Sequence, residues 1–152
     1  MLMAFRSSSD LHCTGHKLRR AVRRATQLYD EALAPTHLTI TQFSLLARLE
    51  KDGESRLSDL ADQIGMDRTS LSRTIRPLTT RGLVVSRMGQ HDRRAKVVCL
   101  SKAGRKLFAE AVPLWRRAEK RMAQILSSEG QVALHGFLEN IATSEKMDLE
   151  AA

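Results

Sequence analysis

The chain has 152 residues, the size of one ordinary domain, and a chain of this length buries a hydrophobic core without disulfides or metal ions. Hydrophobic residues make up 42% of the sequence and charged residues 28%, which argues against intrinsic disorder. Two cysteines do not make a disulfide framework, and no apolar run approaches the ~20 residues of a membrane span. We therefore expect a cytoplasmic protein without a membrane partner.

The positive charge is concentrated in one third of the chain. The formal net charge is +8, and residues 56–106 hold twelve basic and only four acidic side chains, while the charges of the remaining residues cancel. A localised basic region is typical of a protein that binds a polyanion, either nucleic acid or an anionic membrane. A solvated basic surface would show the same excess. Aromatic residues are scarce, which argues against the stacking surfaces of RNA-binding proteins.

Two helices are predicted before the basic region. Apolar residues recur at helical spacing between Leu11 and Leu33, and Ala34-Pro35 should end that helix. Residues 39–42 read Thr-Ile-Thr-Gln, which is a capping box, and they predict a second helix that runs to about Glu50.

A helix-turn-helix is predicted next. Ser58 is the expected N-cap of a short third helix, and Gly65 fits the position that follows its end. Only one residue separates Gly65 from Asp67, the expected N-cap of a fourth helix over 68–81. Two helices joined by so tight a turn are typical of DNA-binding proteins.

After the fourth predicted helix, the spacing of apolar residues changes from that of a helix to that of a strand. Residues 83–87 and 96–100 are predicted strands around a polar tip, and a hairpin in this position is a wing. Ser101 should cap a long fifth helix, kinked at Pro113, and residues 127–129 should start a sixth. The predicted fold class is mainly α with a small β-hairpin wing, that is, a winged helix-turn-helix with a helical dimerisation region.

The fourth helix has two chemically distinct faces. At ~100° per residue, Leu71, Ile75 and Leu78 share one side. The opposite side carries hydroxyl and guanidinium groups, contributed by Thr69, Arg73, Arg76 and Thr80. Arginine bonds guanine O6 and N7 in a bidentate way, and Ser or Thr bonds bases or phosphates. This pattern favours a helix that reads the major groove over a merely solvated face.

The hairpin tip supplies a second expected contact. Arg93 and Arg94 lie there beside Asp92, and an arginine on a thin ribbon fits a narrow minor groove. Asp92 is expected to hold the tip or to orient an arginine. The full set of predicted DNA contacts is Arg56, Ser58, Arg68, Thr69, Ser70, Ser72, Arg73, Arg76, Arg87, Asp92, Arg93 and Arg94.

Residues 11–126 resemble a transcription regulator of the multiple antibiotic resistance repressor (MarR) family. The last of the matching stretches carries the family's wing signature, D-x-R followed by a strand that ends in L-[ST]-x-x-G. The stretches that carry the resemblance are Leu57–Ala61, Met66–Arg73, Arg81–Val84 and Asp92–Gly104, and the run between Leu18 and Phe43 also fits.

The resemblance implies a homodimer that binds a pseudo-palindromic operator and, as is usual in the family, represses transcription. Residues 1–36 and 103–152 would form the helical dimerisation region, and 37–102 the DNA-binding domain. The helix at 68–81 would lie in the major groove, and Arg94 would reach the minor groove. Many family members release DNA when a small-molecule ligand binds, so a small-molecule effector is a further expected partner.

Four residues are candidates for sensing: Cys13, His16, Phe43 and Trp115. One branch of the family senses oxidants through a thiol in the first helix, but Gly15 occupies the matching position here, so Cys13 is out of register. Phe43 and Trp115 would line a ligand pocket, although core packing is the simpler explanation for both. His12, Cys13 and His16 are too few for a zinc site, so neither metal nor cofactor is expected.

Two rival functions remain. The sequence has no nucleotide-binding, metalloprotease or hydrolase motif, and it has no carboxylate pair suited to acid–base chemistry, so we do not expect an enzyme. The alternatives to a ligand-controlled DNA-binding regulator are a thiol-based oxidant sensor of the same fold and a winged-helix module that binds protein or RNA.

Overall fold

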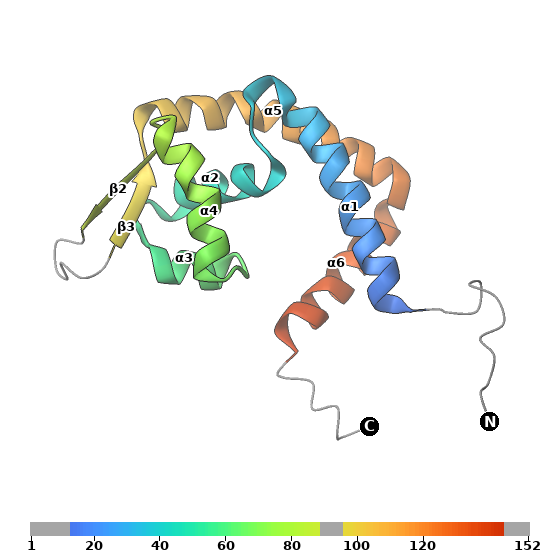
Figure 1. The fold of residues 1–152 in the computed structure, drawn as a ribbon. Helices are drawn as coiled ribbons and strands as arrows, with labels where there is room; N and C mark the ends of the chain where they lie inside the picture. The colour runs from blue at the N-terminus through green and yellow to red at the C-terminus, as the bar shows by residue number, and fades with distance from the viewer. Residues whose placement is uncertain (1–12, 89–95, 145–152) are drawn as a thin grey trace, which may run out of the picture. The chain divides into compact units, whose positions relative to one another are not determined.

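The computed structural model describes residues 13–88 and 96–144 (Figure 1). Helices dominate, and they accompany one small antiparallel sheet, as the sequence predicts. By compactness the chain divides into two units, 1–115 and 116–152, and helix α5 contributes to both. The elements are α1 (Thr14–Leu33), the 3-10 turn η1 (Ala34–Thr36), α2 (Ile40–Asp52), β1 (Ser55–Arg56), α3 (Leu57–Gln63), α4 (Arg68–Thr80), β2 (Val84–Met88), β3 (Lys96–Leu100), α5 (Lys102–Leu126) and α6 (Ser128–Thr143).

The connection between α1 and α2 is held by hydrogen bonds at both ends. The chain continues past Leu33 in 3-10 geometry, where the Thr36 hydroxyl donates to the Leu33 carbonyl oxygen at 2.7 Å. The predicted capping box at Thr39 is confirmed, because its hydroxyl accepts from the Gln42 amide and the Gln42 side chain accepts from the Thr39 amide. The Ile40 amide donates to Asp30 Oδ1 at 2.6 Å, which ties the start of α2 to α1.

The prediction that Ser58 caps the third helix is wrong. Ser55 and Arg56 form β1, a two-residue strand paired with β3, and the helix begins directly after it at Leu57. Arg56 is therefore the N-cap, with extended backbone and no side-chain cap bond. The Ser58 hydroxyl donates instead to Asp59 Oδ1 at 3.0 Å. The pairing of β1 with a strand forty residues away decides where α3 starts.

The strand order is β1-β3-β2, and β2 lies one residue later than the predicted 83–87. Residues that oppose one another in an antiparallel pair point to the same side of the sheet. The inner face of the wing therefore carries Val84, Ser86, Met88, Lys96, Val98 and Leu100. Val84, Val98 and Leu100 join the core, so the inner face packs on the helices at its base. The outer face carries Val85, Arg87, Val97 and Cys99, with Arg56 of β1 in line.

One core joins the wing to the helices that precede it and to the start of α5. Its largest fully buried side chains include seven leucines from α1, α2, α3 and α4. The buried members are Leu33, Leu38, Phe43, Leu45, Leu46, Leu49, Leu60, Ala61, Leu71, Ile75, Leu78, Leu83, Val84, Val98, Leu100 and Ala111. Among them are the three α4 residues that the helical wheel predicts to face inward.

Helix α5 starts against the backbone at the beginning of the wing. Ser101 caps it as predicted, since its hydroxyl accepts from the Gly104 amide at 2.9 Å, and the same hydroxyl donates to the Gly82 carbonyl oxygen at 2.7 Å. A Cβ on Gly104 would lie 2.0 Å from the Leu83 carbonyl oxygen, so only glycine fits this approach. The helix continues through Pro113, and the kink expected there stays a prediction.

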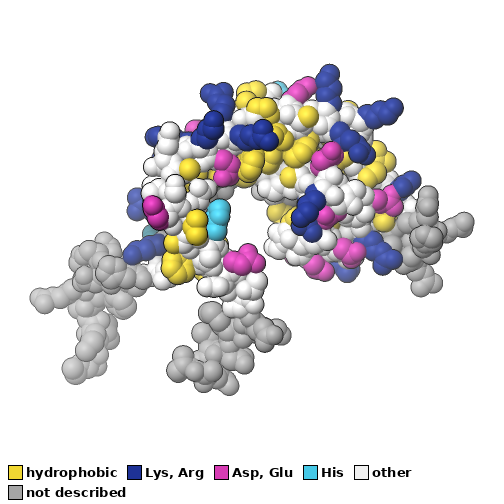
Figure 2. All heavy atoms as spheres, turned by 180° about the vertical axis from the view of Figure 1, so that it is seen from behind, with side chains coloured by type: hydrophobic (Ala, Val, Ile, Leu, Met, Phe, Trp, Pro, Cys, Tyr) yellow, Lys and Arg dark blue, Asp and Glu magenta, His cyan; other side chains and the backbone are white. Residues whose placement is uncertain are grey.

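The second unit contains the end of α5 and α6. Ser127 caps α6 by accepting from the Gly130 amide, as the predicted restart requires. None of the residues of α6 is buried. Hydrophobic side chains reach the surface in several places (Figure 2). In this unit the large ones are Ile125 (59% exposed), Val132 (75%), Phe137 (65%), Leu138 (43%) and Ile141 (55%).

Candidate nucleic-acid interface

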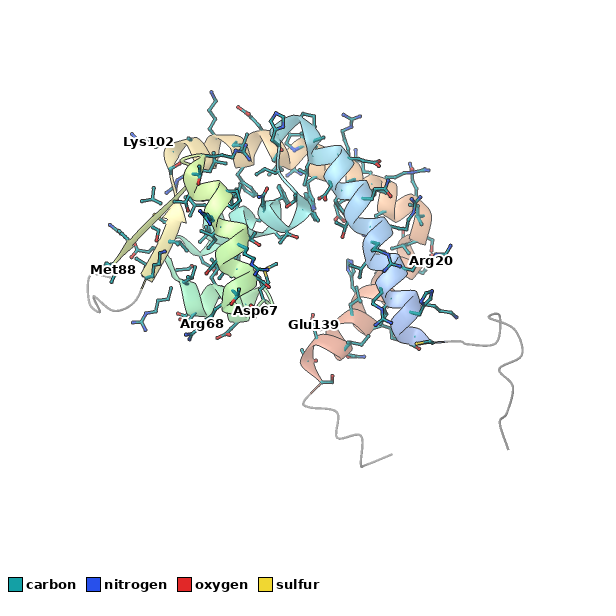
Figure 3. All side chains as sticks on the ribbon, viewed as in Figure 1. Arg20, Asp67, Arg68, Met88, Lys102 and Glu139 are labelled. Atoms are coloured by element: carbon teal, nitrogen blue, oxygen red, sulfur yellow. The ribbon has the colours of Figure 1, made fainter. Side chains whose placement is uncertain are left out.

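Helix α4 begins at a fully formed cap. The Oδ1 atom of Asp67 accepts from the amides of Thr69 and Ser70, both at 2.9 Å, and Oδ2 accepts from the Ser70 hydroxyl at 2.6 Å. The Ser70 hydroxyl, followed by the backbone amides, holds the pKa of the Asp67 carboxyl below its usual value. The cap fixes the first turn of α4, where several of the predicted contacts lie (Figure 3).

The two faces of α4 are as the sequence predicts. Leu71, Ile75 and Leu78 are buried against the core. On the opposite side the hydroxyl and guanidinium groups are exposed, at Thr69, Arg73, Arg76 and Thr80. A helix anchored on its inner side and polar on its outer side presents donors and acceptors in a fixed arrangement.

The hydroxyl groups of α4 differ in whether their protons are already used in hydrogen bonds within the protein. The Ser70 proton is engaged by Asp67, and Thr80 donates to the carbonyl oxygen of Arg76 at 3.0 Å. Thr69 and Ser72 make no side-chain hydrogen bond within the described part of the chain, and both are exposed. Thr69 and Ser72 are therefore the hydroxyl groups freest to donate to a base or a phosphate.

Pro77 lies inside α4 without ending it. Proline has no amide hydrogen, so the bond that residue 77 would make to the preceding turn is missing. Helix α4 nevertheless extends to Thr80, and the hydroxyls of Thr79 and Thr80 bond carbonyl oxygens of the same helix. Arg76 and Thr80 therefore remain on a continuous helix with Arg73.

The predicted contacts outside α4 lie on β1, α3 and the wing. Arg56 is exposed at the end of β1, whereas Ser58 is half-buried at the start of α3. Arg87 lies on the outer face of the wing and forms an ion pair with Glu54, which raises the pKa of its guanidinium. Asp92, Arg93 and Arg94 lie outside the described residues.

The arginines of α4 are not neutralised by nearby acids. Within residues 13–88 and 96–144 two ion pairs are present, Arg48 with Asp52 at 2.6 Å and Arg87 with Glu54. Arg68, Arg73 and Arg76 belong to neither and are exposed. An uncompensated row of cations on one helix displaces counterions when it meets a polyanion.

The candidates for sensing lie in different surroundings. Cys13 is an exposed free thiol at the start of α1, and His16 is exposed one turn later. Phe43 and Trp115 stack with ring centroids 5.6 Å apart, and Phe108 packs on Phe43 at 5.3 Å. Phe43 is buried in the core and Trp115 is packed against it, which is the simpler of the two roles expected for them.

Sequence reasoning missed two features of this region. Strand β1 has only two residues, too few for any periodic signal, and its partner is distant in sequence. The partner of Arg87, Glu54, precedes β1 and becomes a neighbour only through that pairing. Glu54 is distant from Arg87 in sequence, so the ion pair could be predicted only if β1 had been predicted first.

A family model described as "MarR family" matches residues 38–96, which span the end of the α1–α2 connection, the helix-turn-helix and most of the wing. The chain belongs to the MarR family. Its winged helix-turn-helix is that of a transcriptional regulator, and its family and relatives are regulators rather than enzymes.

Three similar proteins place this family membership in context. The transcriptional repressor NicR of Pseudomonas putida is 26% identical over 87% of this chain and 84% of its own length. The Mycobacterium tuberculosis regulator MosR, solved in complex with DNA, is 36% identical over 86% of this chain and 94% of that chain, with a TM-score of 0.78. BpsR of Bordetella bronchiseptica, whose DNA binding is regulated by 6-hydroxynicotinic acid, is 26% identical over 93% of this chain and 100% of that chain, with a TM-score of 0.82.

Within the described ranges, no three His, Cys, Asp or Glu side chains lie close enough together to hold a metal ion. No helix in the described part of the chain has the length and apolar character needed to span a bilayer.

Proposed function

We propose that this MarR-family chain is a homodimeric, sequence-specific repressor that binds double-stranded DNA. The observation that carries the proposal is the outer face of α4, where exposed guanidinium and hydroxyl groups stand on a helix that is capped at Asp67 and buried along Leu71, Ile75 and Leu78. Such groups in a fixed row match the donor and acceptor pattern of the major groove. The DNA complex of MosR and the description of NicR as a repressor support the same function.

The predicted contacts do not all have the same proposed role. Thr69, Ser72 and Arg73 read base edges, because they are exposed and free of partners within the described residues. The described arginines outside this set position the protein on phosphates, namely Arg56, Arg68, Arg76 and Arg87. Ser58 and Ser70 are not given this role, because their hydroxyl protons are donated to Asp59 and Asp67. At the tip, Arg93 and Arg94 are proposed to reach the adjacent minor groove, and Asp92 is proposed to hold the tip or to orient an arginine.

The homodimer is proposed to form through the helical regions 1–36 and 103–152. Helix α6 has no buried residue, yet it exposes Val132, Phe137 and Ile141. Exposed apolar side chains at this density mark a surface that a partner covers. A second copy of the chain is the partner that also supplies a second reading helix, about one turn of DNA away, for a pseudo-palindrome.

A small molecule is proposed to control DNA binding, as 6-hydroxynicotinic acid does for BpsR. We propose that the regulator acts in the cytoplasm.

Selection of bound duplexes from a random pool tests the proposal. The expected result is an enriched pseudo-palindrome whose affinity falls steeply with salt, with a slope of about −0.9 per phosphate contacted. Single-stranded RNA of matching sequence serves as the competitor. Failure to enrich any duplex, or an affinity that does not respond to ionic strength, contradicts the proposal.

A further inference from the structure

The ion pair between Glu54 and Arg87 spans the width of the small sheet. Glu54 directly precedes β1 and Arg87 lies on β2, and these are the outer strands of the order β1-β3-β2. The Oε2 atom of Glu54 accepts from Arg87 Nε at 2.9 Å and also from Nη2. The arginine side chain is 52% exposed and the glutamate side chain 35%. Since so exposed a pair adds little to the free energy of folding, its more important consequence is the position that it imposes on the guanidinium.

The aliphatic stem of Arg87 is held by the sheet beneath it. Val97 lies on the outer face of the wing, opposite Arg87 on one side and Arg56 on the other. It is only 6% exposed, although it does not belong to the core on the inner face. Long basic side chains cover apolar surface with their stems, so the burial of Val97 indicates that its two cross-strand neighbours lie over it. Arg87 is therefore fixed at two points, by Val97 along its stem and by Glu54 at its guanidinium.

The bonds to Glu54 leave one complete edge of the guanidinium unused. A guanidinium has five N–H groups, and Glu54 accepts from the one on Nε and from one of the two on Nη2. Both N–H groups on Nη1 and the second one on Nη2 have no partner within residues 13–88 and 96–144. The edge formed by Nη1 and Nη2 can bond two oxygens of one phosphate at the same time. Arg87 can thus contact a phosphate without leaving Glu54.

We propose that Glu54 is a positioning residue that holds Arg87 with this free edge available to a DNA phosphate. The inference rests on the proposed function, in which Arg87 contacts the DNA backbone. Two effects of Glu54 oppose each other, because its carboxylate repels the phosphate but also removes rotational freedom that an unattached arginine would lose on binding. The repulsion acts across the guanidinium and through water, where the Debye length is about 8 Å at physiological ionic strength, so salt screens much of it. Ordering therefore outweighs repulsion, and Glu54 strengthens DNA binding although it is an acid.

The affinity of Glu54 variants for the selected duplex, measured by fluorescence anisotropy, tests the sign of this effect. Glu54→Ala is expected to weaken binding about five-fold, whereas the mere loss of a negative charge would strengthen it. Glu54→Gln keeps an oxygen that can accept from Arg87 Nε, so it should weaken binding only about two-fold. Glu50→Ala is the matched control, because it removes an exposed acid of α2 that belongs to neither ion pair of the described ranges. It should not weaken binding.

A double-mutant cycle separates positioning of Arg87 from a structural role of Glu54. Arg87→Ala is expected to weaken the duplex about ten-fold and to lower the salt slope by about 0.9, because one phosphate contact is lost. In this background, Glu54→Ala should cause no further weakening, since Glu54 acts only through Arg87. A structural role of Glu54 would weaken binding to the same extent in both backgrounds, and that result would overturn the proposal.

Side-chain NMR of the full-length, DNA-free protein tests the ordering itself. The Nε–H signal of Arg87 is assigned by its absence from Arg87→Ala, and its order parameter reports motion on the picosecond to nanosecond timescale. In the wild type we expect an order parameter at least twice that of Arg56, whose guanidinium has no acidic partner in the described ranges. In Glu54→Ala the two arginines should become equally mobile.

The opposite outcomes overturn the proposal in distinct ways. If Glu54→Ala binds the duplex as tightly as the wild type, or more tightly, Glu54 competes with DNA for Arg87 and does not position it. A mobile Arg87 in the wild-type protein overturns the proposal whether or not DNA binds. If a duplex is bound and Glu54→Ala does not weaken it, this inference alone fails. If the wild type binds no duplex, the proposed repressor fails, and the role of Glu54 in DNA binding fails with it.

Discussion

The winged helix-turn-helix buries its apolar side chains, whereas α6 leaves its own exposed. In the first unit, leucines from four helices and the inner face of the wing are fully buried in one core. In the second, α6 carries apolar residues of similar size and buries none of them. The first arrangement is complete within one chain. The second exposes apolar side chains of the kind that a partner surface covers. In the proposed homodimer, the part that reads DNA and the part that pairs two readers therefore have different requirements.

The largest effect is expected from a charge placed on the exposed apolar surface of α6. Phe137→Glu is expected to weaken the homodimer by about 4 kcal/mol, roughly a thousand-fold in the dissociation constant, because a carboxylate would be buried unpaired at the interface. Sedimentation velocity measures the change, and Phe137→Leu is the control that should remain dimeric. A Phe137→Glu protein that stays dimeric would show that α6 faces solvent in the assembly.

Within the first unit, the tightest test of the core is Gly104→Ala. The added Cβ would lie 2.0 Å from the Leu83 carbonyl oxygen, so α5 must move away from the wing. We expect the free energy of unfolding to fall by about 3 kcal/mol, measured by urea denaturation. Gly15→Ala, where the new methyl group meets only ordinary contacts, should not destabilise. Equal stability of the two variants would contradict the close approach.

Arg73→Ala should weaken DNA binding and leave dimerisation and folding unchanged. Loss of one bidentate base contact is expected to weaken the selected duplex by about 2 kcal/mol, roughly 30-fold, and to relax preference at one position of each half-site. Fluorescence anisotropy on a panel of single-base variants measures both effects. Equal weakening on every sequence would reassign Arg73 to a phosphate, and Lys106→Ala should leave affinity unchanged.

The smallest expected effect concerns the cap of α4. The pKa of Asp67 is lowered in the folded state, so its stabilising contribution is fully present above the ordinary carboxyl pKa of 3.8 and is lost as the pH falls through the folded value. Asp67→Ala should therefore lower the melting temperature at pH 7, and its difference from wild type should shrink as the pH falls below 3.8. Asp67→Asn keeps an N-cap acceptor and should remain close to wild type at pH 7. A difference between Asp67→Ala and wild type that does not shrink with acid would contradict the lowered pKa.

The helices and their caps could be predicted because their signals are local. Thr39, Asp67, Ser101 and Ser127 each cap the helix that their spacing indicates. The two faces of α4 also followed from periodicity alone. These features depend on residues within one or two turns, where spacing fixes geometry.

The parts that could not be predicted depend on contacts between distant segments. Strand β1 exists because it pairs with β3, and that pairing moves the start of α3 away from Ser58. The same pairing brings Glu54 to Arg87, so a residue read as a free cation is found in an ion pair. Ser70 was read as a DNA contact, yet its proton is engaged by the cap. Sequence patterns indicate which side chains are polar, but not which of them already form hydrogen bonds or ion pairs within the protein.

The last turn of α4 is bonded to the connection between the first two helices. Arg81, the C-cap residue, donates from Nη1 to the His37 carbonyl oxygen at 2.8 Å and from Nη2 to that of Thr36 at 3.0 Å. A few residues on, the Ile40 amide is held by Asp30 of α1. The reading helix is thus tethered, through one guanidinium, to the end of α1. A displacement of the end of α1 would therefore tilt α4. The affinity for an operator would then change even though the side chains that face the operator stay the same.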